Sequence, residues 1–179
     1  FFIFTYIVCL KYALMKKYTL LLLFVFTALL SCTTEETTTY YLIRHAEKVR
    51  TDATNRNPDL NEAGKKRAIN WARYFKNIAL EAVYSTKYNR TIQTATPTAN
   101  QMNLSIQHYD PKKMYTEDFA AATKGKKILI VGHSNTTPVF ANKILGEAKY
   151  KNMDDHDNAS LYIVTVVGAK KTSRIEILE

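Results

Sequence analysis

Cysteine is scarce in this 179-residue chain, which contains two, Cys9 and Cys32. No cysteine follows position 32, so residues 33–179 are excluded from disulfide chemistry, thiol catalysis and cysteine metal binding. Dense basic clusters are also lacking, because Lys and Arg are scattered and the longest run is Lys65-Lys66-Arg67. A nucleic-acid partner is therefore not expected, and a solvated surface is the better interpretation of the positive charge.

A long membrane-spanning run is lacking as well. The apolar stretch Leu20–Leu30 follows the basic residues Lys16 and Lys17 and ends in small residues. Because this stretch is too short to cross a bilayer, residues 15–31 are predicted to be a secretory signal peptide, with an uncleaved N-terminal anchor helix as the alternative. Residues 1–14 precede Met15, a natural initiator. They are interpreted as upstream sequence that is not part of the natural protein.

The end of this segment, Leu29-Leu30-Ser31-Cys32, resembles a bacterial lipobox. The resemblance implies that Cys32 is lipidated and attaches the protein to a membrane of the bacterial cell envelope, in a periplasmic or outer-membrane-associated location. Residues 32–39 are rich in Thr and Glu and predict a short tether. Without Lys11, Lys16 and Lys17, the formal net charge falls from +9 to +6, which is weakly consistent with an anionic substrate.

Residues 40–179 are predicted to form one α/β domain. Apolar runs of strand length alternate with segments of helical periodicity, which favours a three-layer α/β/α sandwich with a mostly parallel central sheet. A helix is expected over Asn61–Phe75 with Asp59 or Asn61 as its cap, another after Arg90 with a kink or short first turn at Pro97, and a third over Asn135–Leu145 ended by Gly146. The expected strands are Thr39–Ile43, Ala82–Ser85, Leu104–Tyr109, Lys127–Val131, Leu161–Val167 and an edge strand Ser173–Leu178.

Two histidines follow buried strands directly. His45 comes after Thr39–Ile43 and Arg44, and His133 comes after Lys127–Val131 and Gly132. Ligands of open α/β sheets bind at the carboxyl ends of the strands, so both imidazoles are expected in one crevice. Arg90, in the loop after a third strand, is expected to join them there. Two arginines and two histidines at one such crevice indicate a phosphate site.

The chemistry of these residue types suggests different roles for the two histidines. A neutral imidazole attacks phosphorus, so His45 would form a covalent phosphohistidine. His133, if protonated against the same phosphate, would stabilise charge in the transition state. Ser134 and Asn135 begin the following helix, where backbone N–H groups would donate to the phosphate.

Four ordered motifs resemble those of the histidine phosphatase superfamily, also called phosphoglycerate mutase-like. They are Arg44-His45-Ala46-Glu47, the segment from Leu60 to Ala68, the segment from Ser85 to Ala95 and Gly132-His133-Ser134. The resemblance implies that His45 is the nucleophile, that Arg44, Arg90 and His133 complete the phosphate pocket, and that neither metal nor cofactor is needed. It also implies a carboxylate that protonates the leaving group, for which Asp110 is the first candidate and Glu117 the second.

The chain resembles the compact, phosphohistidine-phosphatase-like branch of that family, because the segment between Arg90 and His133 has no room for a long insertion. The expected activity is hydrolysis of a small phosphorylated substrate. The alternatives are a catalytically silent, lipid-anchored protein that binds a phospholigand, and a phosphomutase. The turn Asp154-Asp155-His156-Asp157 is interpreted as an exposed acidic turn, with cation binding as the alternative. His108 is expected on a strand face without a role.

Overall fold

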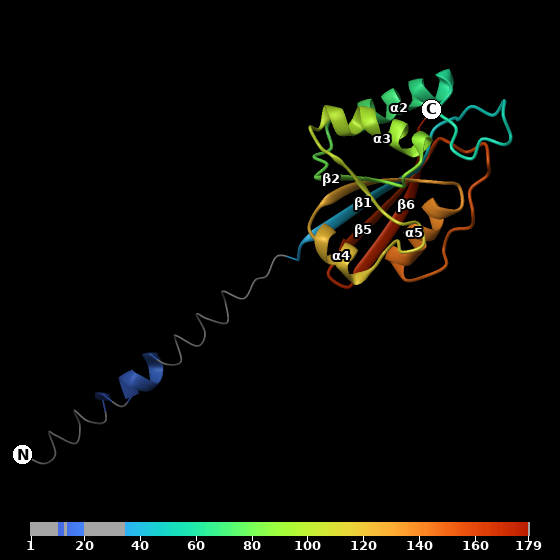
Figure 1. Ribbon diagram of the computed structural model, residues 1–179. Coiled ribbons are helices and arrows are strands. Elements are labelled where there is room, and N and C mark those ends of the chain that lie inside the picture. Colours follow the sequence, from blue (N-terminus) through green and yellow to red (C-terminus); the bar gives the residue numbers. More distant parts are fainter. Residues whose placement is uncertain (1–10, 13, 20–34, 179) are drawn as a thin grey trace, which may run out of the picture. The chain divides into compact units, whose positions relative to one another are not determined.

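The computed structural model describes residues 11–12, 14–19 and 35–178 (Figure 1). The helical residues among 11–19 belong to a separate unit from the one that begins at Glu36. Within these ranges, no helix is both long enough and apolar enough to span a membrane. Cys32 and most of the predicted signal peptide lie outside the described residues, so lipidation stays a prediction.

The second unit is built on a six-stranded sheet with the strand order β3-β2-β4-β1-β5-β6. β1 pairs in parallel with β4, which pairs in parallel with β2, and β2 pairs in parallel with β3. The last two strands run antiparallel to their neighbours. The strands are β1 (Thr37–Arg44), β2 (Ala82–Ser85), β3 (Ile106–His108), β4 (Lys127–Gly132), β5 (Ser160–Val167) and β6 (Lys170–Ile177).

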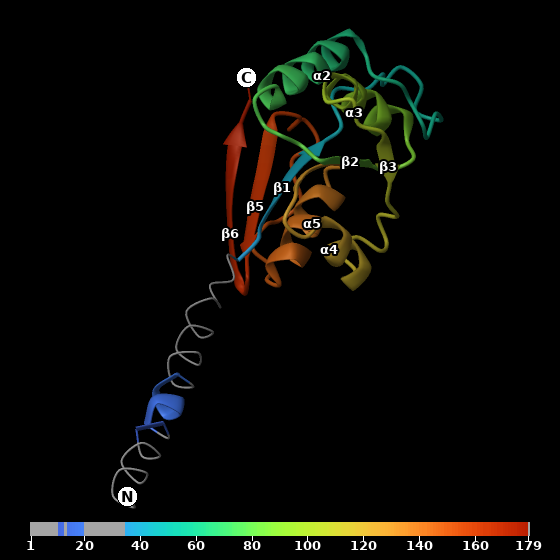
Figure 2. The ribbon, with the colours of Figure 1, turned by 90° about the vertical axis from the view of Figure 1, so that its left-hand side faces the viewer.

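Helices cover the two faces of this sheet. α2 (Glu62–Phe75) and α3 (Asn89–Gln101) lie on one face, and α4 (Glu117–Thr123) and α5 (Thr136–Leu145) lie on the other (Figures 1 and 2). The predicted three-layer α/β architecture with a mostly parallel sheet is confirmed.

Alternation along the central strands creates the two halves of the core. Leu42 in β1 and Ile128 in β4 pack with Phe140 of α5. The next residue of each strand, Ile43 in β1 and Leu129 in β4, packs on the opposite face with Trp71 of α2. Successive strand residues point to opposite faces, so apolar runs such as Ile128–Val131 supply both halves. This double burial fixes β1 and β4 at the centre of the sheet, and therefore fixes the loops that follow them.

The structure of α3 differs from its prediction, and α4 has no counterpart among the predicted helices. α3 continues through Pro97 from Asn89 to Gln101, so the expected short first turn is wrong. One face of α3, including Thr94, Ala95 and Ala99, is buried, and this packing outweighs the one backbone hydrogen bond that proline removes. α4 was not expected from the sequence. It begins after Thr116, whose hydroxyl accepts a hydrogen bond from the Phe119 N–H.

Gly64 sets how closely α2 approaches the loop that follows β1. An added Cβ at this position would overlap the carbonyl oxygen of Glu47, so a larger residue would push the helix away. Asn61 caps the same helix by accepting a hydrogen bond from the Gly64 N–H. One of the two predicted caps is therefore confirmed, and the first turn of α2 is held against the loop that carries His45.

Candidate active site

His45 and His133 lie together where the two central strands end. Arg44 and Gly132 are paired across β1 and β4, and the N–H of His45 donates to the carbonyl oxygen of Gly132 at 2.9 Å. The two imidazole rings follow directly, with their centroids 5.5 Å apart. The predicted convergence of the two histidines is thus a direct consequence of the parallel pairing of two buried strands.

The surroundings of His45 leave one ring nitrogen available as a nucleophile. Its Nδ1 lies 2.8 Å from the carbonyl oxygen of Ala46, which accepts only an N–H, so the neutral ring carries its lone pair on Nε2. Burial, with smaller contributions from the nearby charges of Arg44 and Arg90, lowers the pKa of His45 to about 3, against the opposing effect of the Ala46 carbonyl. His45 is therefore unprotonated at neutral pH.

Two side chains hold the backbone around His45. The amide of Asn158 donates to the His45 carbonyl oxygen at 2.7 Å, and the Ala46 N–H donates to the Thr94 hydroxyl at 2.9 Å. Both groups are buried. Asn158 was missed at the sequence level, because its contact reaches 113 residues along the chain and leaves no local pattern.

His133 is held from both of its ring nitrogens. Nδ1 lies 3.4 Å from Nη2 of Arg90, a donor, so Nδ1 accepts and Nε2 carries the proton that it donates to the Thr86 hydroxyl at 3.0 Å. Burial, with Arg90 and Arg44, lowers the pKa of His133 to about 4. His133 is therefore neutral at neutral pH. The charge of a bound phosphate dianion would favour its protonated form.

Arg44 is almost fully buried, with 2% of the residue exposed. Its Nη1 donates to the carbonyl oxygens of Asp154 and Asp157, at 3.0 and 3.2 Å, and its Nη2 donates to the Asp155 carboxylate at 2.6 Å. The acidic turn 154–157 therefore positions the guanidinium group. This is a role that the sequence interpretation of an exposed turn did not include.

Arg44 and Arg90 each have a hydrogen-bond donor that is not used by the residues that the structure describes. Within the described part of the chain, Nε of Arg44 and Nε of Arg90 are buried and have no hydrogen-bond partner. Arg90 also stacks on Tyr88, with its guanidinium carbon 4.5 Å from the ring centroid, and Tyr88 in turn packs against His133. A buried N–H without a partner is costly, and an oxyanion reached by both groups would satisfy it.

The other predicted site residues differ in how close they come to the two histidines and two arginines. Asp110 lies in the loop after β3 and accepts a hydrogen bond from the Lys112 N–H. Glu117 is exposed in the first turn of α4. At the start of α5, the N–H groups of Thr136 and Thr137 already donate to the His133 carbonyl oxygen, so the predicted helix-start donors are reduced to those of Ser134 and Asn135.

Two cavities flank the histidines. The first has a volume of about 250 Å³ and the second about 430 Å³. Asp110 lines the second cavity, whereas Glu117 lines neither. The first cavity is lined by His45, Glu47, Lys48, Arg50, Asn61, Asp155, His156 and Asn158, and the second by Thr86, Lys87, Tyr88, His108, Tyr109, Asp110 and Pro111.

Neutralising Asp155 is expected to strengthen phosphate binding. The carboxylate lies against Arg44 and Arg50, and hydrogen bonding from Arg50 holds its pKa below the usual range, so it opposes an incoming anion. Asp155→Asn removes the charge and keeps an acceptor for Arg44. Because Asp155 is 60% exposed, the inhibition constant of inorganic phosphate should fall by only about threefold. A rise in this inhibition constant would instead show that the charge of Asp155 is needed to position Arg44.

Residues 40–111 match the family model of the histidine phosphatase superfamily (branch 1). The match includes Arg44, His45 and Arg90 and ends before His133, so the place of His133 in the site comes from the geometry. No curated protein matches the chain in sequence.

Solved structures share the fold at low identity. A protein assigned as the phosphohistidine phosphatase SixA of Agrobacterium tumefaciens is 21% identical, with a TM-score of 0.59 over 78% of this chain and 97% of that one. A phosphoglycerate mutase from Bacillus anthracis is 18% identical, with a TM-score of 0.60 over 81% and 94%. The protein histidine phosphatase SixA complexed with tungstate is 15% identical, with a TM-score of 0.62 over 78% and 96%.

Proposed function

The domain belongs to the histidine phosphatase superfamily, and on that premise we propose that it is a metal-independent phosphatase that hydrolyses phosphomonoesters through a phosphohistidine on His45. One observation carries the proposal. An unprotonated His45 with its Nε2 available lies beside His133 and two arginines whose buried Nε–H groups lack partners in the described chain. Together these groups supply a nucleophile and donors for a phosphate dianion.

The reaction then takes two displacements. Nε2 of His45 attacks phosphorus, the P–O bond to the ester oxygen breaks, and the departing oxygen takes a proton. Water next attacks the phosphohistidine and gives a proton to the carboxylate that protonated the ester oxygen, the N–P bond breaks, and phosphate leaves while His45 regains its lone pair. Arg44 and Arg90 neutralise the phosphoryl oxygens in both steps, and the protonated form of His133, which the bound dianion favours, stabilises the charge that accumulates on them.

Asp110 is proposed to supply the proton for the leaving oxygen, because it is the carboxylate that lines the larger cavity. Asp110→Asn is expected to lower kcat/KM for an alkyl phosphate by about 10²-fold, and for 4-nitrophenyl phosphate by less than about fivefold, because nitrophenolate leaves without a proton. Equal losses on both substrates would contradict this role. Glu117→Gln is the matched variant, and a selective loss there would assign the proton to Glu117.

The low pKa values of the histidines predict activity that persists in acid. An imidazole with the ordinary pKa of about 6.5 would be roughly 97% protonated at pH 5, whereas His45, with a pKa of about 3, stays unprotonated there. With 4-nitrophenyl phosphate, whose leaving group needs no proton, and with substrate ionisation corrected for, kcat/KM should stay on a plateau down to about pH 4 and fall below it. A decline centred near pH 6.5 would show that the nucleophile is not this buried imidazole.

The direct test is turnover of 4-nitrophenyl phosphate by the full chain, with and without EDTA. Activity that EDTA leaves intact supports the proposal. Binding of inorganic phosphate without turnover would favour the silent phospholigand-binding protein instead. Exchange between sugar-phosphate isomers would favour a phosphomutase.

We further propose that the phosphatase acts at the bacterial cell envelope, attached through a lipid on Cys32. The sequence Leu29-Leu30-Ser31-Cys32 supports this location, and a small phosphorylated substrate outside the cytoplasm is consistent with it. Metabolic labelling with a radioactive fatty acid tests the assignment: label should enter the wild type and be absent from Cys32→Ser. Equal labelling of both proteins would overturn it.

A further inference from the structure

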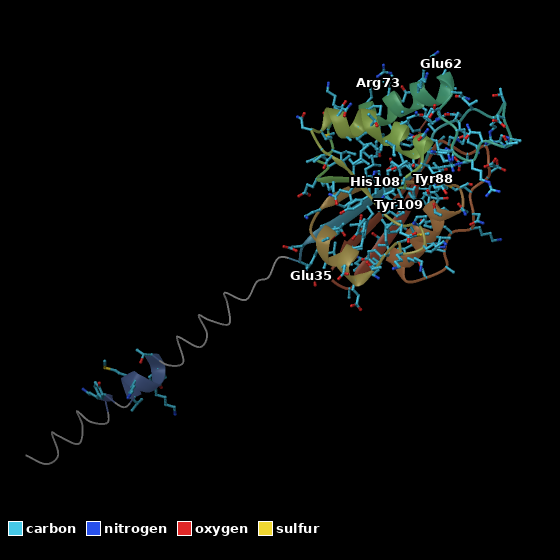
Figure 3. The ribbon with its side chains drawn as sticks, viewed as in Figure 1. Glu35, Glu62, Arg73, Tyr88, His108 and Tyr109 are labelled. Carbon is cyan, nitrogen blue, oxygen red and sulfur yellow. The ribbon has the colours of Figure 1, made fainter. Side chains whose placement is uncertain are left out.

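None of the four residues proposed to contact the phosphoryl group, Arg44, His45, Arg90 and His133, lines the larger cavity. It lies between the loop that follows β2 and the loop that follows β3, two neighbouring parallel strands. Figure 3 shows three of its lining residues, Tyr88, His108 and Tyr109, gathered between the two helical layers. Its volume of about 430 Å³ is within the range of pockets that hold small organic ligands.

This cavity adjoins the site from the side of His133. Thr86 lines the cavity and accepts a hydrogen bond from His133, and Tyr88 lines it and packs on the same imidazole with ring centroids 5.1 Å apart. His45 lines the other cavity and not this one. In-line displacement places the leaving group on the side of phosphorus remote from the nucleophile. Of the two cavities, the larger one is the candidate for that side, because His45 does not line it.

The lining has the composition of a site for a flat ring. Tyr88, which is 39% exposed, lines the cavity together with the exposed imidazole of His108 and the ring of Pro111. Lys87 makes no ion pair within residues 35–178, which leaves its ammonium group free to approach a π face. Aromatic rings favour stacked or edge-to-face contact with another aromatic ring over contact with an alkyl group.

Resting on the proposed phosphatase function, we propose that this cavity is the leaving-group subsite and that it selects phosphomonoesters whose alcohol carries a single aromatic ring. The smaller cavity is less suited to that ring, because charged and amide side chains dominate its lining. Asp110, the carboxylate in the larger cavity, then stands on the side where the ester oxygen departs. Ring recognition and protonation of the leaving group are thus served by the same two loops.

Three esters with similar alcohol leaving groups test the subsite without a bias from intrinsic reactivity: benzyl, cyclohexylmethyl and ethyl phosphate. For the full chain, kcat/KM should be about tenfold or more higher for benzyl than for ethyl phosphate, with cyclohexylmethyl phosphate several-fold below benzyl. Equal values for benzyl and ethyl phosphate would overturn the subsite. Equal values for benzyl and cyclohexylmethyl phosphate would overturn the aromatic selectivity.

Two exposed histidines provide matched variants. His108→Ala should lower the benzyl-to-ethyl ratio by about threefold or more, whereas His156→Ala, the same change at the smaller cavity, should keep the ratio within about twofold. A larger loss in His156→Ala than in His108→Ala would place the ring in the smaller cavity and overturn the assignment.

Non-hydrolysable phosphonates separate this inference from the proposed function. Calorimetric titration should show benzylphosphonate binding about tenfold more tightly than ethylphosphonate. If the chain turns over no ester but keeps this preference, the subsite stands and the phosphatase proposal fails. If it turns over all three esters equally and binds the two phosphonates equally, the phosphatase proposal stands and the subsite fails.

Discussion

Replacing His45 by alanine is expected to lower kcat/KM for 4-nitrophenyl phosphate by at least about 10⁴-fold, because the covalent route is lost with the nucleophile. The fold should survive. Asn158 donates to the backbone carbonyl of residue 45 and not to the imidazole, and the Gly132 carbonyl accepts from its backbone N–H. An unchanged melting temperature to within a few degrees, together with retained binding of inorganic phosphate, would separate lost chemistry from lost structure.

Trapping the intermediate sharpens this prediction. Rapid quenching after mixing with a ³²P-labelled ester should leave label that is stable in base and labile in acid, as a phosphoramidate is. His133→Ala should slow the labelling but retain it, because His133 stabilises charge and does not form the bond. Labelling of His45→Ala to the wild-type level would show that another residue attacks phosphorus.

The site was predictable wherever it depends on strand ends. Apolar runs such as Ile128–Val131 are buried on both faces, so they predict central parallel strands, and the crevice at their carboxyl ends follows from the architecture. The structure accordingly brings His45, His133 and Arg44 together as expected. Arg90 follows for the same reason, because it lies in the first turn of α3, the helix that follows β2, and β2 is the neighbour of β4.

The side chains that hold these groups were not predictable in the same way. Asp155 reaches Arg44 across 111 residues and Asn158 reaches His45 across 113, and single polar contacts at such separations leave no periodic signal. The short helix α4 was missed for a local reason, since its seven residues Glu117–Thr123 are too few to show an amphipathic repeat. Sequence patterns therefore predicted which candidate residues lie together, and packing determined their support.

Arg44→Lys is expected to lower kcat/KM by about 10²- to 10³-fold although the charge is kept. Two of the guanidinium nitrogens are committed to the turn 154–157, which leaves the buried Nε–H and one Nη2 hydrogen as a fork for two phosphate oxygens. An ammonium group presents no such fork, and the loss of one such donor pair from a buried position carries a cost of this size.

Arg50→Lys is the matched control, because Arg50 also binds Asp155 but is half exposed. It should change kcat/KM by less than about threefold. In Arg44→Lys the inhibition constant of inorganic phosphate should rise by a factor similar to the fall in kcat/KM. The reason is that the fork binds the dianion in the ground state and in the transition state alike. Equal small effects in the two variants would mean that the phosphate is held by charge alone and that the buried Nε–H of Arg44 has no part in binding it.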